Sequence, residues 1–393
     1  MEQFNSINLF IFMRLVRKCM QSKCLILFLI FLFLNSCITQ FIPQTNVDKQ
    51  LLVVEGLITD QPVVNTIKLS KSLPLGTINM ANPLDGCIVS ISDDLGNMYP
   101  LSEIHSGTYV TDPEIFKGEI GRKYSLHIKT NTLNNNYNYE SLPVEMKPVP
   151  PIDSVYYEKK VIEEIEGVKK QEGCQIYLNT HDPANMCKFF RWEFSETWEF
   201  QIPYHVQNRV CWISNNSSAI NIKNTSVLAQ DKIERFPLLF ISNQTDRLKV
   251  KYSLLVNQYS LTEDEYLYWE KLQNMSDQVG GLYDMIPAGI PGNVYCIENP
   301  NEKVLGYFSA SASSSKRIFI EDHFAGIFTQ YTNDICITDT IYGNDIIPYL
   351  NSGIWVLLTN IIPPIRVVTD IKGCADCTVR GTIIEPDFWK EGK

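Results

Sequence analysis

The sequence has little histidine and lacks the spacings that histidine-based catalytic and metal sites use. Its five histidines, in 393 residues, fall one to a segment, at His105, His127, His181, His205 and His323. No paired-histidine metal motif, nucleophile elbow or glycine-rich phosphate loop occurs. These absences predict a non-enzymatic protein with no cofactor and no bound metal.

Basic residues are also in short supply. The chain has 34 Lys and Arg against 44 Asp and Glu, a formal net charge of −10. Residues 1–36 carry four basic residues and one acidic residue, a net +3, which leaves about −13 on the rest. Because nucleic-acid binding depends on Lys and Arg neutralising phosphates, the charge argues against nucleic acid as a partner.

No apolar run is long enough for a membrane-spanning helix, which needs about 20 residues. The longest, Leu25–Leu34, follows four basic residues and ends in two polar residues before Cys37. This order is typical of a secretory signal peptide. We predict a signal peptide over residues 1–36, with Met13 as a possible start, and a tether over 37–49. An uncleaved transmembrane anchor is the alternative.

The residues before Cys37, Leu34-Asn35-Ser36, complete a sequence that resembles a bacterial lipobox. The resemblance implies cleavage before Cys37, acylation of that residue and attachment to membrane lipid. Several acyl chains make attachment stable, at about 0.8 kcal/mol per buried CH₂. Ile38 stands where an inner-membrane retention signal has aspartate, so we expect the outer membrane. Both the periplasmic and the cell-surface face stay open.

Eight cysteines follow Cys37, an even number that favours disulfides in an exported protein. The candidates are the last five, Cys211, Cys296, Cys336, Cys374 and Cys377. Cys374 and Cys377 have the spacing of half a zinc site or of a redox pair. However, zinc needs four ligands, and a redox pair needs a βαβ context that is missing here. We therefore expect disulfide use.

Short alternating segments begin at Leu51 and continue to residue 147. Apolar residues fall at every second position within them, which puts one face of each strand on a core. Turn residues separate these segments, and no helical pattern lies between them. We predict a mainly β protein that begins with an immunoglobulin- or transthyretin-like β-sandwich over residues 50–147.

A larger β-rich domain is expected over residues 152–393, with one inserted amphipathic helix at about 262–276. Ser260-Leu261-Thr262-Glu263 fits a capping box, and Tyr266, Trp269 and Leu272 share one face of the helix. Packing of that face against the second sheet is the main expectation, and docking of another protein is the alternative.

Three tryptophans are candidate binding residues: Trp192, Trp198 and Trp269. Each is also large enough to serve as a core residue, which is the competing interpretation. Ser313-Ser314-Ser315-Lys316 matches the Ser-x-x-Lys motif of penicillin-recognising enzymes. That match is weak, because the companion motifs of those enzymes are absent.

Several stretches, taken in order, resemble the DUF4249 family of Bacteroidetes-type lipoproteins. The matching stretches are Leu52–Gly56, Pro150–Val155, Glu196–Phe200, Lys251–Ser260, Gly292–Val294, Leu305–Ser311, Cys374 with Cys377, and Pro386–Trp389. The resemblance implies a place beside a TonB-dependent outer-membrane receptor, as an accessory or binding partner in transport. The alternative is a surface-exposed binder of a glycan or a host protein, and a hydrolase ranks last.

Overall fold

The computed structural model describes residues 50–73, 82–131, 137–163, 171–202, 204–278, 289–321, 327, 338–342, 346–362, 365–369 and 372–390. The predicted signal peptide, Cys37 and the predicted tether lie outside them. Within these residues, no helix is both long and apolar enough to cross a bilayer. Residues 50–393 form one unit, and the predicted mainly β class is confirmed.

Two sheets form a first sandwich. The first sheet has the order β19 (Leu305–Ser311), β1 (Leu52–Thr59), β2 (Thr66–Lys71), β7 (Thr108–Val110), β6 (Ser102–His105), with β3 (Asn82–Pro83) beside β2. The second has the order β18 (Val294–Cys296), β9 (Asn138–Ser141), β8 (Lys123–Lys129), β4 (Ile88–Asp93), β5 (Met98–Pro100), with β10 (Val144–Glu145) beside β8.

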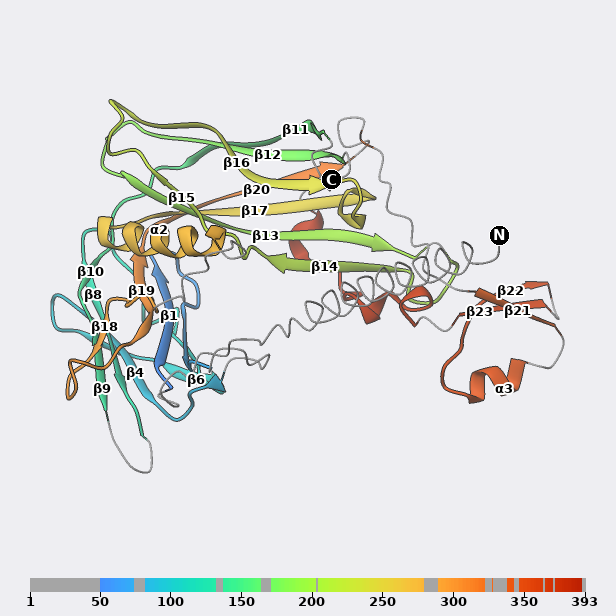
Figure 1. The fold of residues 1–393 in the computed structure, drawn as a ribbon, viewed down its shortest axis with the longest axis horizontal. Coiled ribbons are helices and arrows are strands. Elements are labelled where there is room, and N and C mark those ends of the chain that lie inside the picture. The colour runs from blue at the N-terminus through green and yellow to red at the C-terminus, as the bar shows by residue number, and fades with distance from the viewer. Residues whose placement is uncertain are drawn as a thin grey trace, which may run out of the picture. The chain divides into compact units, whose positions relative to one another are not determined.

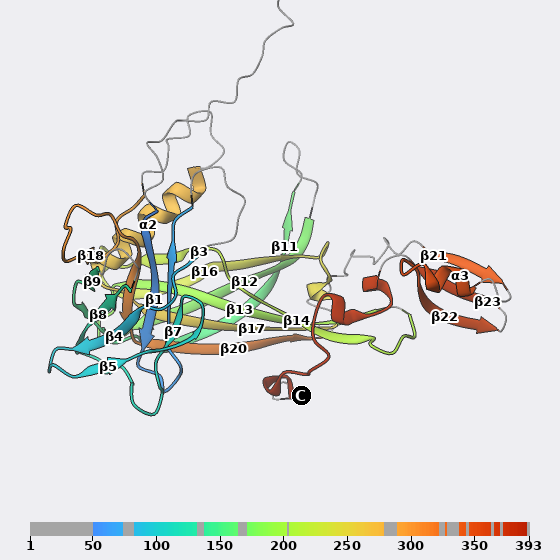
Figure 2. The ribbon, with the colours of Figure 1, turned by 90° about the horizontal axis from the view of Figure 1, so that it is seen from below.

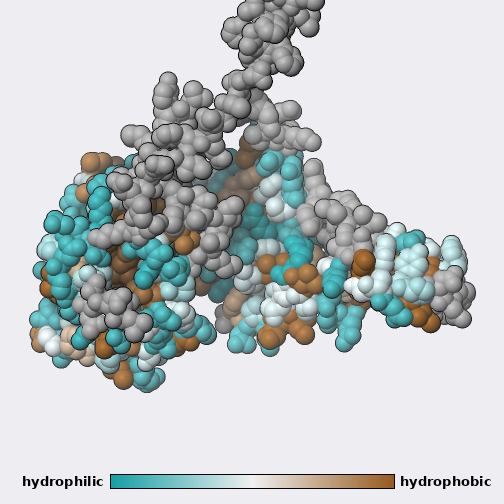
Figure 3. Space-filling model, turned by 60° about the horizontal axis from the view of Figure 1, so that its bottom comes forward, coloured by the Kyte–Doolittle hydropathy of each residue, from teal (hydrophilic) through white to brown (hydrophobic). Residues whose placement is uncertain are grey.

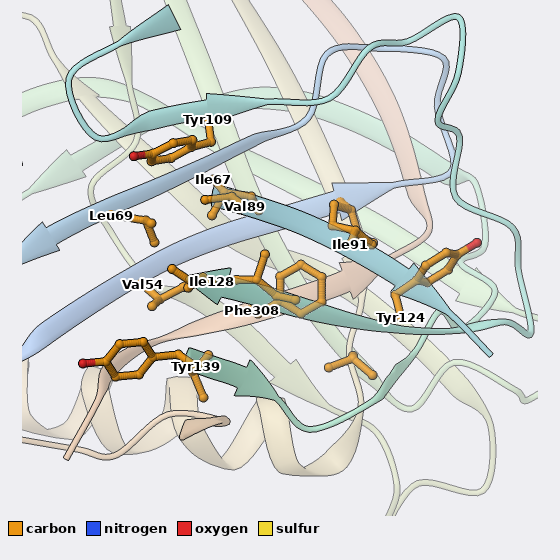
Figure 4. Close-up of a cluster of buried hydrophobic side chains, with 14 of the residues drawn as sticks. Val54, Ile67, Leu69, Val89, Ile91, Tyr109, Tyr124, Ile128, Tyr139 and Phe308 are labelled. Carbon is orange, nitrogen blue, oxygen red and sulfur yellow. The ribbon is translucent and has the colours of Figure 1, made fainter. Parts of the chain in front are cut away.

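Alternation along the strands builds the core between these sheets. Val54 and Ile58 of β1 are fully buried, and Glu55 between them is exposed. Val54, Ile67 and Phe308 of the first sheet meet Val89, Ile91 and Ile128 of the second (Figure 4). The prediction of strands with one buried face is therefore confirmed, whereas the immunoglobulin- or transthyretin-like topology stays a prediction.

Two strands of the first sandwich come from far along the chain. β19 pairs with β1 in parallel, and β18 pairs with β9 antiparallel. Both belong to the segment expected in the second domain, so the structure differs from the predicted plan of 50–147 followed by 152–393. The residues between β10 and β18 form an insertion in the first sandwich. Local patterning cannot reveal such a pairing, because it reports a strand without naming its partner.

The second sandwich also has two sheets. One contains β11 (Ile152–Ile162), β12 (Gln171–Asp182) and β16 (Asp231–Ser242). The other has the order β14 (Val210–Asn216), β13 (Phe189–Gln201), β17 (Lys251–Ser260), β20 (Ser313–Glu321), with β15 (Asn221–Asn224) beside β13. β13, β17 and β20 run alongside one another as long strands (Figures 1 and 2).

Helix α2 (Glu263–Gln278) confirms the predicted helix to within two residues. Its cap differs from the prediction. Ser260 pairs with Phe190 as the last residue of β17, and Thr262 Oγ1 accepts the Glu265 amide at 3.3 Å. Tyr266 packs with Phe189 of β13 at 5.2 Å between ring centroids. The expected packing on the sheet of the second domain is therefore confirmed.

The remaining described residues form smaller pieces. A third group of strands has the order β21 (Thr338–Tyr342), β23 (Ile365–Thr369), β22 (Val356–Ile362), and α3 (Ile346–Asn351) contacts β22. Four short 3₁₀ turns complete the described elements: η1 (Asp246–Leu248), η3 (Lys372–Cys374), η4 (Cys377–Val379) and η5 (Asp387–Lys390). A disulfide joins Cys377 to Cys211 of β14, and Trp389 packs on Trp212 with ring centroids 6.4 Å apart.

Replacing Gly306 should break the β1–β19 pair. Gly306 has φ +86°, and an added Cβ would lie 1.9 Å from the Val54 carbonyl oxygen. Gly96 has the same φ with open space around it, so Gly96→Ala measures the conformational cost alone. We expect Gly96→Ala to lower the free energy of unfolding by about 1 kcal/mol and Gly306→Ala by about 3 kcal/mol or more in denaturant titrations. Equal losses would contradict the close approach.

Removing the disulfide should destabilise the fold. Cys211 and Cys377 are 166 residues apart, so the bond closes a long loop in the unfolded chain. Cys377→Ser should lower the free energy of unfolding by about 3 to 5 kcal/mol. Cys87→Ser removes a free, half-buried thiol and serves as the control, with an expected loss below about 1 kcal/mol. Both variants are measured by denaturant titration. Equal losses for Cys377→Ser and Cys87→Ser would count against a stabilising disulfide.

Candidate functional site

The outer face of the first sheet carries two adjacent rows of side chains, most of them polar or aromatic. The strand register puts Lys68, Glu55 and Tyr307 in one row across β2, β1 and β19. The neighbouring row holds Thr66, Leu57 and Ser309. These side chains point away from the core, because side chains alternate between the two faces of a strand. They form one wall of a cleft.

Helix α2 and β13 form the opposite wall. The Tyr268 ring packs on the Tyr307 ring with 4.9 Å between centroids. The Arg191 guanidinium lies 3.8 Å from the centroid of the Trp269 ring and forms an ion pair with Glu193. Such a cation–π contact holds the planar guanidinium in one orientation. The second sandwich thus places a fixed, charged side chain opposite the wall that the first sandwich supplies.

We name this space the junction cleft. It has a volume of about 290 Å³ and is lined by Val54, Glu55, Gly56, Leu57, Thr66, Lys68, Arg191, Glu193, Tyr268, Trp269, Gly306, Tyr307 and Ser309. A second space, the adjacent hollow, has a volume of about 540 Å³. Its lining residues are Lys123, Leu142–Glu145, Thr262, Asp264, Leu267, Tyr268, Lys271, Ile290–Asn293 and Tyr307. Tyr268 and Tyr307 line both spaces and so form their common wall.

Gly292 and Asn293 line the adjacent hollow where it meets β19. An added Cβ at Gly292 would lie 1.6 Å from the Gly306 carbonyl oxygen, so only glycine lets these backbones approach. Next to it, buried Asn293 accepts from the Phe308 amide at 2.9 Å and donates to the Phe308 carbonyl at 2.8 Å. The amide side chain therefore pairs with β19 as a strand backbone would.

A buried carboxyl group lies behind the cleft. Glu265 of α2 accepts from Ser309 Oγ at 2.5 Å and from Trp269 Nε1 at 3.3 Å. Its second oxygen, Oε2, is buried and has no hydrogen-bond partner among the described residues. Burial raises the pKa of Glu265, although these two hydrogen bonds and the charge of Arg191 oppose the shift. Glu265 thus joins α2 to β19 and orients two residues that line the cleft.

The structure separates the three candidate tryptophans. Trp269 lines the junction cleft, as a binding residue could. Trp192 and Trp198 are 0% and 5% exposed in the core of the second sandwich, so they cannot act as an open binding platform. Their positions alternate inward along β13, and a large apolar ring gains most from full burial. For this pair the core interpretation holds.

The candidate cysteines also differ in whether they form disulfides. Cys211–Cys377 is one of the pairs that the sequence allowed, and Cys374 is disulfide-bonded as well. Cys296 was a candidate too, and that prediction is wrong, because its thiol is free and buried in the first sandwich. Cys336 lies outside the described residues.

The weak Ser-x-x-Lys match has a different structural role. Ser313 and Lys316 stand three residues apart on β20, so they point to opposite faces. The Ser313 amide donates to Asp60 Oδ1 at 2.8 Å, and Lys316 Nζ donates to the Asp153 carbonyl at 2.5 Å. Both residues therefore tie β20 to its surroundings and do not meet in a common site.

One constellation was not foreseen from the sequence. Ser92 Oγ lies 2.8 Å from His127 Nε2, and His127 Nδ1 lies 4.0 Å from Glu140 Oε1. The order resembles a Ser–His–acid array, but 4.0 Å exceeds a hydrogen bond, and neither the cleft nor the hollow includes these residues. Only the register of β4, β8 and β9 brings them together. Within the described residues, no group of three His, Cys, Asp or Glu could hold a metal ion.

The surface mixes apolar and polar side chains. On the face drawn in Figure 3, hydrophobic and hydrophilic residues are interspersed. Large exposed apolar side chains such as Val227 and Leu95 are scattered along the sequence. Because ligand sites are usually concave and of mixed polarity, the junction cleft is a stronger candidate than a flat apolar patch.

Comparison with protein families agrees with the resemblance noted above. The model of the family described as "Domain of unknown function (DUF4249)" matches residues 38–317. The chain belongs to this family. No curated protein matches the sequence. Two of the stretches that suggested DUF4249 line these spaces: Leu305–Ser311 contributes to the junction cleft, and Gly292–Val294 contributes to the adjacent hollow.

Glu265 should make stability depend on pH. Its pKa is raised in the folded protein, so the folded state keeps a proton that the unfolded chain loses above about pH 4.5. The contribution of Glu265 to stability is therefore present below that pH and is lost as pH rises through the folded pKa. Glu265→Gln keeps the acceptor for Ser309 and Trp269 but cannot titrate. We expect its free energy of unfolding, relative to the wild type, to increase with pH above about 4.5.

Denaturant titrations over a pH series test this difference. Glu270→Gln is the control, since Glu270 lies on the same helix, is half-buried and accepts from Tyr266. Parallel pH profiles for wild type and Glu265→Gln would contradict the role of burial at Glu265.

Proposed function

We propose that this protein is a lipid-anchored binding protein of the outer membrane and a non-enzymatic accessory to a TonB-dependent receptor. The observation that carries the proposal is the junction cleft. Its walls come from two sandwiches, and its rings and charged groups are held by contacts within the protein. Such pre-organisation favours binding, because few side chains lose freedom when a ligand enters.

The sequence supports the anchoring part of the proposal. The family match begins at residue 38, directly after the predicted acylated cysteine, as expected for a mature chain that starts at Cys37. Attachment to a membrane confines a binding protein to the same surface as its receptor. Confinement raises the effective concentration of one partner near the other and so strengthens a weak contact.

Replacing Cys37 should release the protein from the membrane. We expect Cys37→Ala to move the protein from the membrane fraction to the soluble fraction or leave it with an uncleaved signal, as measured by fractionation and intact mass spectrometry. No acylated form of the variant should be detected, because Cys37 is the predicted attachment point and stable anchoring needs the acyl chains. Cys24→Ala, which changes a cysteine inside the predicted signal peptide, is the control and should be acylated as in the wild type.

Affinity purification tests the partner. Wild-type protein purified from detergent extracts of its native cells should recover an outer-membrane receptor barrel, and Cys37→Ala should recover less of it. An acylated wild-type protein that recovers no barrel would speak against the accessory role.

The second candidate function is a surface-exposed binder of a glycan or a host protein. The aromatic side chains Tyr268, Trp269 and Tyr307 around the cleft favour it, since such rings often contact ligands. Protease treatment of intact cells separates the two. A protein on the periplasmic side stays protected, whereas a protein on the cell surface is cleaved.

A further inference from the structure

Both spaces at the junction are balanced in charge. The junction cleft has two acidic and two basic residues, Glu55, Glu193, Lys68 and Arg191. The adjacent hollow also has two of each, Glu145, Asp264, Lys123 and Lys271. Because complementary sites match the charge of their ligand, balance favours a ligand without net charge.

The wall shared by the two spaces is aromatic. Tyr268 and Tyr307 pack at 4.9 Å between centroids, and Trp269 lies beside Tyr268 at 5.4 Å. Burial, and then the charge of Glu55, raises the pKa of Tyr268 to about 12, so its hydroxyl stays protonated at neutral pH. The wall therefore combines aromatic rings with a neutral hydroxyl. Sugar rings suit such a wall, since they have apolar C–H faces and hydroxyl edges.

Fixed donors and acceptors surround these rings. Arg191 supplies guanidinium donors beside the acceptor Glu193, and Thr66 supplies a hydroxyl group on the opposite wall. A sugar hydroxyl donates one hydrogen bond and accepts others, so adjacent donor and acceptor groups satisfy it fully. A ligand without hydroxyl groups would leave more of these polar groups unpaired on binding.

A peptide fits this place less well. Extended peptides commonly bind by adding a strand to a free sheet edge. The cleft instead lies over the face of the first sheet, and β1 at its centre is already paired with β2 and β19. Backbone hydrogen bonds of β1 are therefore used within the protein, and a peptide cannot add to this sheet as a strand at β1.

We infer that the junction cleft and the adjacent hollow form one site for a neutral oligosaccharide, which crosses the Tyr268–Tyr307 pair. The inference rests on the proposed binding function and names its ligand class. Volumes of about 290 and 540 Å³ together fall within the range of about 300 to 1,000 Å³ of small-ligand sites. They accommodate a short chain of sugar rings, with one part on each side of the tyrosine pair.

Calorimetry on the full-length acylated protein in detergent tests the inference. The probes are short neutral gluco-, manno-, galacto- and xylo-oligosaccharides, a uronic-acid oligosaccharide and a neutral peptide. At least one neutral oligosaccharide should bind, with an affinity that changes less than about twofold between about 0.05 and about 0.5 M salt. Binding only to the uronic-acid probe or to the peptide, or binding to none of the probes, would overturn the ligand class.

Variants of the shared wall locate the binding. Tyr268→Ala should weaken the oligosaccharide at least about tenfold, and Tyr268→Phe, which keeps the ring, should stay within about threefold of wild type. Tyr295→Ala is the matched control, since Tyr295 is 40% exposed on β18 and lines neither space. Equal affinity for Tyr268→Ala and Tyr295→Ala would overturn the assigned place.

The outcome for the proposed function is read separately. A protein that recovers its receptor barrel but binds no neutral oligosaccharide overturns the ligand class and leaves the accessory role standing. A protein that binds a neutral oligosaccharide at Tyr268 but recovers no barrel supports the ligand class and contradicts the accessory role.

Discussion

One unbroken stretch of chain, from Leu305 to Glu321, belongs to both sandwiches. β19 ends at Ser311 in the first sandwich, β20 begins at Ser313 in the second, and the single residue between them, Ala312, is fully buried. Asp60 accepts from the Ser313 amide at 2.8 Å and ties the end of β1 to this crossing point. The two sandwiches therefore meet without a flexible linker. The walls of the junction cleft keep their spacing because of this constraint.

The second sandwich is held by buried polar groups as well as by its apolar core. Gln258, fully buried, accepts from Trp192 Nε1 at 2.8 Å and donates to the Pro150 carbonyl at 2.8 Å. Buried Glu196 accepts from Arg247 at 3.0 Å and from Tyr252 at 2.8 Å. Satisfied networks of this kind fix one arrangement, since any other arrangement leaves buried polar groups unpaired. They give a physical reason for polar residues within the stretches Lys251–Ser260 and Glu196–Phe200.

The sequence predicts elements better than it predicts their partners. Alternation locates most strands and the capping and amphipathic pattern locates α2, because both depend on neighbouring residues. The pairing of β1 with β19 joins residues such as Val53 and Leu305, and no local pattern encodes it. The candidate site shows the same limit. Trp269 could be proposed from its size and helical position, but Arg191, Lys68 and Tyr307 become neighbours only after the sheets have assembled.

The parallel β1–β19 pair also orders the folding process. β1, β2 and β7 are synthesised long before β19, which ends at residue 311. One edge of β1 therefore has no partner at first. Open strand edges recruit other chains, and distant pairings form slowly because a long loop must close first. The first sheet is therefore complete only when β19 has joined β1. A truncated chain that ends before β19 therefore cannot complete the first sheet.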